Sequence, residues 1–149
     1  MRLELLFPIH LREVMKQLDA IKDLEEIRVR IGQPLFLYTS QKELVLIGEA
    51  FLESGKQNLN ENCYRITEQD ISEMQNYISN YSLYAWQEEL RNGFLTIQGG
   101  HRIGLCGSTT NQDGRIKGMN YLTFFNIRVA HERKGCADKV LPYIQKQKS

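Results

Sequence analysis

The sequence predicts an α+β domain with one largely antiparallel sheet. Three observations carry this prediction: helical periodicity near the N-terminus, short segments in which apolar and polar residues alternate, and polar or glycine-rich turns between those segments. The 149 residues are enough for one domain with its own core. The expected order is one helix, three strands, two helices, and then three or more strands.

The N-terminal third is expected to be a helix followed by an antiparallel meander. Apolar residues recur at spacings of three and four over residues 9–18, after Pro8, which suits the first turn of a helix. Residues 27–31 alternate strictly between apolar residues and arginines, which is typical of a strand with one buried face. Short apolar runs over residues 35–38 and 44–47 predict the next two strands.

The middle of the chain is expected to hold a loop and a pair of helices. Residues 54–62 have the polar composition of a surface loop, and residues 64–66 are interpreted as a brief edge strand. Thr67 is a favourable N-cap for a helix that runs to about residue 77. A second helical segment is expected over residues 82–90.

A glycine-rich β-hairpin is expected next. Residues 94–98 and 101–106 predict its two strands, and Gly99-Gly100 predicts the tight turn, because glycine reaches positive φ without a Cβ clash. The last strand is expected within residues 121–130.

Two glycines inside the second hairpin strand need a reason, because glycine weakens a strand interior. Gly104 and Gly107 indicate either a bulge or the close approach of another group to the backbone. Arg102 shares a strand face with Gly104, so it is placed to help hold such a group.

Composition excludes several classes of function. The formal net charge of +1 gives no overall field for nucleic acid or an anionic membrane, and no apolar run is long enough to span a bilayer. Three widely spaced cysteines and three histidines show neither disulfide nor metal-ligand spacing, so no metal is expected. Because no phosphate-binding G-x-x-x-x-G-K-[ST] motif is present, we expect neither a nucleotide cofactor nor an enzyme in this chain alone.

The arginines are the stronger indication of function. Each of four arginines alternates with apolar residues inside a predicted strand. They indicate either a solvated sheet face that pairs with nearby acids or a surface that binds an anion, since a guanidinium holds phosphate in a bidentate fork. His101 is expected to support the hairpin turn or to cap a sheet edge. The four arginines are Arg28, Arg30, Arg102 and Arg128.

Several blocks of the sequence resemble the family of stage III sporulation protein AA. Residues 24–35 (Leu-Glu-Glu-Ile-Arg-Val-Arg-Ile-Gly-Gln-Pro-Leu) are similar to the start of that family, and residues 99–107, which begin Gly-Gly-His-Arg, are the most specific block. The resemblance covers nearly the whole chain. The other blocks that follow the family's order are 81–85, 88–90, 93–96 and 126–130.

The resemblance implies a cytoplasmic ATPase of spore-forming bacteria, related to the ATPases of type II and type IV pilus secretion systems. In such proteins a PAS-like α+β domain precedes a RecA-like motor, and the whole forms a hexameric ring. The resemblance therefore implies that residues 1–135 are the N-terminal regulatory and oligomerisation domain and that 136–149 are a linker toward the motor. ATP and Mg would belong to the full-length protein, which would be the ATPase.

The family also implies partners and a place of action. The partners would be the chain's own motor domain, neighbouring subunits of the ring, and a membrane platform protein of the channel between mother cell and forespore; nucleic acid is not expected. The protein would be recruited peripherally to the membrane in the mother cell. There it would power assembly of that channel or transport through it.

The relatives imply roles for particular residues. Arg102 and Arg128 would sense the triphosphate that the motor holds, and Arg28, Arg30 and His101 are weaker candidates. The glycines expected to permit close approach are Gly99, Gly100, Gly104 and Gly107. The alternative function is a stand-alone binding module whose arginine-bearing sheet face binds an acidic partner or nucleic acid.

Overall fold

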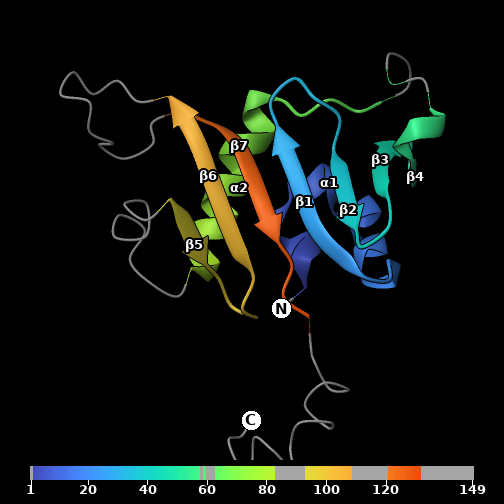
Figure 1. Cartoon of the computed structure of the whole chain (residues 1–149). Helices are drawn as coiled ribbons and strands as arrows, with labels where there is room; N and C mark the ends of the chain where they lie inside the picture. Colours follow the sequence, from blue (N-terminus) through green and yellow to red (C-terminus); the bar gives the residue numbers. More distant parts are fainter. Residues whose placement is uncertain (1, 58, 60–62, 83–92, 109–120, 132–149) are drawn as a thin grey trace, which may run out of the picture.

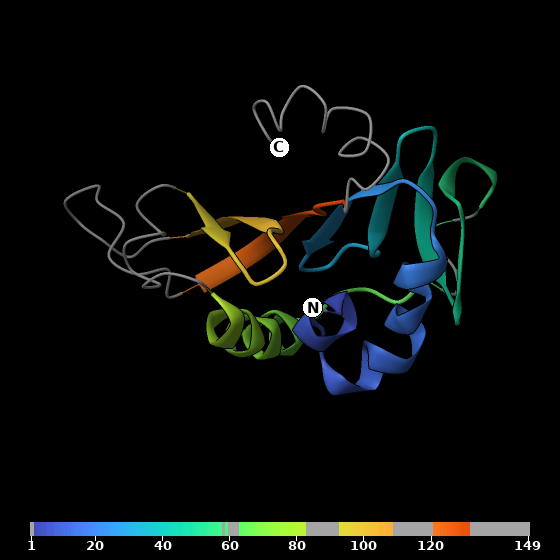
Figure 2. The ribbon, with the colours of Figure 1, turned by 90° about the horizontal axis from the view of Figure 1, so that it is seen from below.

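The computed structural model describes residues 2–57, 59, 63–82, 93–108 and 121–131. They form a seven-stranded antiparallel sheet with the strand order β4-β3-β2-β1-β7-β6-β5. Helices α1 and α2 cover one face of this sheet (Figures 1 and 2). No helix among the described residues covers the other face, which we call the open face. The predicted α+β class with an antiparallel sheet is confirmed.

The predicted N-terminal helix is confirmed, with a change of geometry at its end. Helix α1 (Ile9–Met15) begins after Pro8 and continues as the 3₁₀ helix η2 (Lys16–Ala20). A 3₁₀ helix that was not expected, η1 (Leu3–Leu6), precedes it. The apolar residues at helical spacing, among them Met15, face the core. No helix of the described residues is long and apolar enough to cross a membrane.

The meander has one strand more than predicted. Strands β1 (Leu24–Arg30), β2 (Phe36–Thr39) and β3 (Glu43–Ile47) match the prediction, but β4 (Ala50–Glu53) was missed. Gly48 adopts a positive φ of 63° between β3 and β4, as tight hairpin turns require. Strand β4 lies at the sheet edge and is mostly exposed, so its sequence lacks a clear apolar alternation.

The expected loop and edge strand after β4 also need correction. The 3₁₀ helix η3 (Ser54–Lys56) begins the loop, and Ser54 is buried. Residues 64–66 form no strand: Arg65 and Ile66 make only isolated bridges, to Pro34 and Ile31. One of these bridges is antiparallel and the other is parallel, so the two do not extend into a common ladder.

Helix α2 (Glu68–Tyr81) begins where predicted and runs further than predicted. Thr67 caps it through a capping box: the Asp70 backbone N–H donates to Thr67 Oγ1 at 3.1 Å, and the Thr67 N–H donates to Asp70 Oδ2 at 3.0 Å. Ser82 is extended and ends the helix. The second predicted helical segment, 82–90, otherwise lies outside the described residues, as do the predicted linker and the domain boundary at 135.

The predicted hairpin and last strand are confirmed. Strands β5 (Phe94–Thr96) and β6 (Arg102–Ser108) are joined through Gly99 and Gly100, whose φ angles are 91° and 86°. Strand β7 (Tyr121–Arg128), the last described, is inserted between β1 and β6 in the centre of the sheet. It therefore joins the N-terminal meander to the hairpin (Figure 1).

Two β-bulges keep the buried side chains on the helix-covered face. The register between β6 and β7 shifts after Cys106–Phe124, so that Thr123 is extra and both Leu122 and Phe125 are buried. A similar shift between β1 and β2 adds Glu25, which lets Leu24 stay buried. The core lies between this face and the helices. Its largest fully buried side chains include Phe7, Met15, Ile27, Leu37, Met74, Ile78, Leu95 and Phe125.

Candidate functional site

All four arginines singled out in the sequence lie on the open face of the sheet. Arg28 and Arg30 come from β1, Arg102 from β6 and Arg128 from β7, and all four are exposed. They share this face because the residues that alternate with them, such as Val29 and Ile103, point into the core. The alternation read from the sequence therefore placed these side chains correctly.

The structure brings Arg102 and Arg128 together. They are direct cross-strand partners, and the next pair on the same face is Gly104 with Asn126. With Phe94 these residues line a hollow of about 230 Å³, which we call the arginine-pair hollow. Since Gly104 has no side chain, backbone lines the hollow at this position, next to the Arg102–Arg128 pair.

The charge in this hollow is not balanced within the described part of the chain. Arg102 and Arg128 are directly opposite, an arrangement in which like charges destabilise a sheet. Glu26 is the cross-strand partner of Arg128 on its other side, but its Oε2 lies 2.7 Å from Arg28 Nε. No carboxylate of the described residues pairs with Arg102 or Arg128. A bound oxyanion would relieve the repulsion between them.

Two further contacts shape the arginine-pair hollow. The Arg102 guanidinium lies 4.0 Å from the ring centroid of Phe94, which limits its rotamers while leaving its N–H edge available. Asn126 Oδ1 is buried and has no hydrogen-bond partner among the described residues. The sequence analysis did not select Phe94 or Asn126. Asn126 is two residues from Arg128 in one strand, a spacing that places both on one face and could have identified it.

Arg28 and Arg30 lie in a different part of the open face. Arg28 stacks 4.5 Å from the ring centroid of Tyr38, and its hydrogen bond to Glu26 raises the pKa of the guanidinium. Burial and the neighbouring Glu43 carboxylate raise the pKa of Tyr38 to about 12. The structure thus assigns these arginines to a second hollow, separate from the Arg102–Arg128 pair.

His101 lies outside the arginine-pair hollow. Its side chain is buried, and its Nδ1 accepts a hydrogen bond of 2.9 Å from the backbone N–H of Ala130. This bond ties the hairpin turn to the chain after β7. Burial lowers the pKa of His101, so the neutral form is favoured in the folded protein.

The free energy of unfolding is expected to fall as pH falls through the ordinary histidine range. The pKa of His101 is lower in the folded than in the unfolded state, so the unfolded state takes up more protons and is favoured at low pH. The contribution is present above about pH 6.5 and is lost below it. Urea unfolding at pH 7 and pH 5.5 should show this loss for the natural chain and a smaller one for His101→Asn, whose amide oxygen can accept the same bond. Equal losses of unfolding free energy in the two chains would contradict the prediction.

His101→Ala removes the acceptor of the Ala130 N–H and should lower the free energy of unfolding by about 1 kcal/mol at pH 7.

The four glycines expected to permit close approach occur at their positions for different structural reasons. Gly99 and Gly100 have positive φ, so the turn alone requires them. Gly104 has no such φ, and a Cβ there would meet Asn126 atoms at 3.8 Å, an ordinary contact. Gly107 lies at the β6–β7 register shift. Among these four, only Gly104 lines the arginine-pair hollow.

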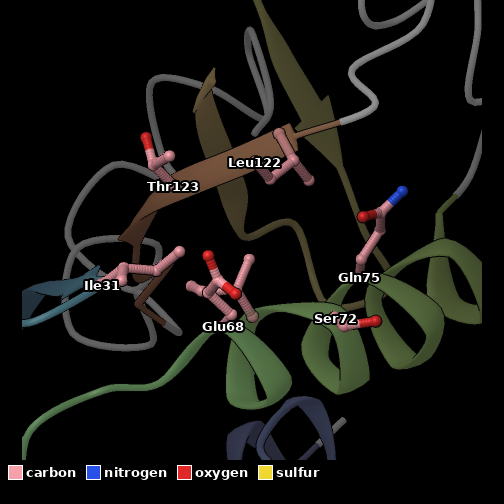
Figure 3. A pocket seen from close by; sticks show the side chains of 7 residues that line it. Ile31, Glu68, Ser72, Gln75, Leu122 and Thr123 are labelled. Atoms are coloured by element: carbon pink, nitrogen blue, oxygen red, sulfur yellow. The ribbon is translucent and has the colours of Figure 1, made fainter. Parts of the chain in front are cut away.

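Another hollow lies on the helix side of the sheet. Glu68, Ser72 and Gln75 of α2 and Leu122 and Thr123 of β7 line it (Figure 3). Its described lining has a carboxylate and no cation. This hollow therefore does not suit an anion, and it is separated from the arginines by the sheet.

The fold and the open face define a class of α+β protein whose antiparallel sheet is covered by helices on one side and presents exposed arginines on the other. The chain belongs to the family described as sporulation stage III, protein AA, whose family model matches residues 2–149. It is 36% identical over 122 residues to stage III sporulation protein AA of Bacillus subtilis (strain 168). The matched region is 82% of this chain and 34% of that relative, so the chain spans about a third of the relative's length. A role in sporulation follows from this membership.

Proposed function

We propose that this chain is the N-terminal regulatory and oligomerisation domain of a sporulation ATPase, with a PAS-like fold. Family membership and the matched 34% of the relative's length support the division into a domain and a larger remainder. The full-length protein would assemble as a hexameric ring in the mother-cell cytoplasm, recruited to the membrane by a platform protein. It would power assembly of the channel to the forespore or transport through it.

The in-register pair Arg102–Arg128 beside Gly104 is the observation that supports a nucleotide-sensing role most directly. Two guanidinium forks on rigid strands can each hold phosphate oxygens, and strands keep them oriented before the phosphate arrives. The missing side chain at Gly104 would let a triphosphate come close. In this proposal the pair stabilises charge on the phosphate during hydrolysis, as arginine fingers do.

The phosphate has to be delivered by another domain. The sequence contains no phosphate-binding loop motif, so the chain's own motor or a neighbouring subunit would hold ATP and Mg. The exposure of Arg102 and Arg128 is consistent with such an approach. These arginines would then couple the position of this domain to the state of the nucleotide.

The full-length protein tests the proposal. Arg102→Ala and Arg128→Ala, made singly, are each expected to lower the ATPase rate about tenfold, about 1.4 kcal/mol of transition-state stabilisation. Both should also impair sporulation. Lys22→Ala, which removes an exposed cation in the turn before β1, is the control and should leave the rate unchanged. Unchanged ATPase and sporulation in both arginine variants would reject the role.

The alternative is a stand-alone binding module that uses the open face for an acidic partner or nucleic acid. The excess of arginines over acids on that face favours it. Under this alternative the isolated chain would bind nucleic acid or an acidic protein with strong salt dependence. The arginine variants would then lose that affinity without a change in ATPase rate.

A further inference from the structure

A second hollow on the open face has no place in the nucleotide-sensing proposal. It has a volume of about 140 Å³ and is formed by residues of β1, β2, β7 and the turn after β1. We call it the Arg30 hollow. Its lining includes Arg28, Arg30, Pro34, Phe36, Tyr38 and Phe124.

One cation in the Arg30 hollow is unpaired within the described part of the chain. Arg28 Nε lies 2.7 Å from Glu26, and the Glu43 carboxylate interacts with Tyr38. No described carboxylate pairs with Arg30. The acids of this region are therefore already engaged, and the hollow as a whole complements an incoming negative charge.

Two of the three aromatic rings that line this hollow already have an arginine over one face. The guanidinium of Arg28 lies 4.5 Å from the centroid of Tyr38, and that of Arg30 lies 4.8 Å from the centroid of Phe124. These two ring faces are therefore not free to stack on the bases of single-stranded nucleic acid. A stacked guanidinium keeps its in-plane N–H groups free, and these groups suit a carboxylate.

The remaining lining consists of Gln33 and the apolar residues Pro34 and Phe36. Pro34 is buried, and Phe36 is half-buried. An apolar floor beside a fixed cation fits a peptide segment in which an acidic residue neighbours an apolar one. Arginine and tyrosine around such a floor are the residue types that dominate protein–protein binding energy.

We propose that the Arg30 hollow docks an acidic segment of a partner protein, with a carboxylate on Arg30 and an apolar side chain against Phe36 and Pro34. The site uses residues other than Arg102 and Arg128. It therefore stands independently of the nucleotide-sensing proposal.

The 149-residue chain with ¹⁵N-labelled arginine side chains tests this site by NMR. The probes are a short capped peptide of alternating glutamate and leucine, sodium tripolyphosphate, and oligothymidine. The peptide is expected to shift the Arg30 Nε–H signal. Arg30→Met should weaken peptide binding about fivefold or more, the loss expected for a residue worth at least 1 kcal/mol.

Matched variants separate a specific site from general attraction. Arg102→Met removes the same charge from the same face, Lys22→Met removes a cation from a turn, and each should change peptide affinity less than about twofold. Arg30→Lys keeps the charge but loses the planar fork, so it should bind with intermediate affinity. Unfolding midpoints of all variants, measured in urea, confirm that the compared chains are folded.

Several outcomes would overturn the docking site. These are unchanged peptide affinity in Arg30→Met, equal losses in Arg30→Met and Arg102→Met, or oligothymidine that binds more tightly than the peptide and shifts the same signals. Concentration-dependent self-association abolished by Arg30→Met would replace the partner with a second copy of the chain and would also reject it. Tripolyphosphate that shifts the Arg30 Nε–H signal as strongly as the peptide does would show a general attraction of anions and would also reject the docking site.

Discussion

Phe125→Ala is expected to lower the free energy of unfolding by about 3–5 kcal/mol, the cost of deleting a large side chain from a packed core. Phe125 is fully buried on the central strand β7, opposite Val29 of β1 and Leu105 of β6. The cavity would open where the meander and the hairpin are joined. Because a domain of this size is stable by only about 5–15 kcal/mol, much of its stability would be lost.

Urea unfolding followed by circular dichroism measures this loss, and the neighbouring residue provides the control. Phe124→Ala makes the same chemical change one position earlier, but Phe124 is half-buried on the open face under Arg30. It should cost less than about 2 kcal/mol. Equal costs for the two variants would show that the two faces of β7 are not differently buried.

The same strand links stability to the candidate site. Phe125 and Ile127 hold β7 against the helices, while Asn126 and Arg128 on the other face line the arginine-pair hollow. The position of Arg128 relative to Arg102 therefore depends on core packing beneath it. A core variant that still folds is therefore expected to weaken phosphate binding in the arginine-pair hollow, although it changes none of the residues that line this hollow.

Asp70→Ala is expected to lower the free energy of unfolding by about 2–3 kcal/mol, because it removes a helix cap and leaves partly buried donors unpaired. Asp70 is almost fully buried. It accepts hydrogen bonds from the Thr67 N–H and the Tyr64 hydroxyl, and His10 Nε2 lies 3.3 Å from its Oδ1. Burial and the adjoining Asp70 carboxylate raise the pKa of Tyr64, so its hydroxyl stays a donor.

Two further variants divide the contribution of Asp70. Asp70→Asn keeps one acceptor oxygen and should cost about half as much as Asp70→Ala. Glu68→Ala removes an exposed carboxylate from the same first turn and should cost less than about 1 kcal/mol, through the helix dipole alone. If Asp70→Ala were no more costly than Glu68→Ala, the buried cluster would contribute nothing to stability.

The candidate site could be predicted from the sequence in part. Alternation within a strand showed that Arg28 and Arg30 share a face and that Arg102 lies with Gly104, because side-chain direction in a strand has a period of two. The pairing of Arg102 with Arg128 could not be read in the same way. The two residues belong to strands β6 and β7, and their register depends on a bulge at Thr123.

The errors in the predicted fold have physical reasons too. Strand β4 was missed because an exposed edge strand needs little apolar alternation. Its backbone pairing with β3, rather than a buried face, holds it in the sheet. Residues 64–66 were expected to form a strand on composition, but the neighbouring backbone offers them only isolated bridges.

By itself, the sequence determined the class of fold, the Thr67 cap, the Gly99-Gly100 turn and the face on which each arginine lies. These features depend on residues within a few positions of one another. Only the tertiary structure decided that β7 lies at the centre of the sheet, that Arg102 faces Arg128, and that Arg30 lies in a separate hollow. Such features depend on pairing between distant segments, whose register is set by burial on the helix-covered face.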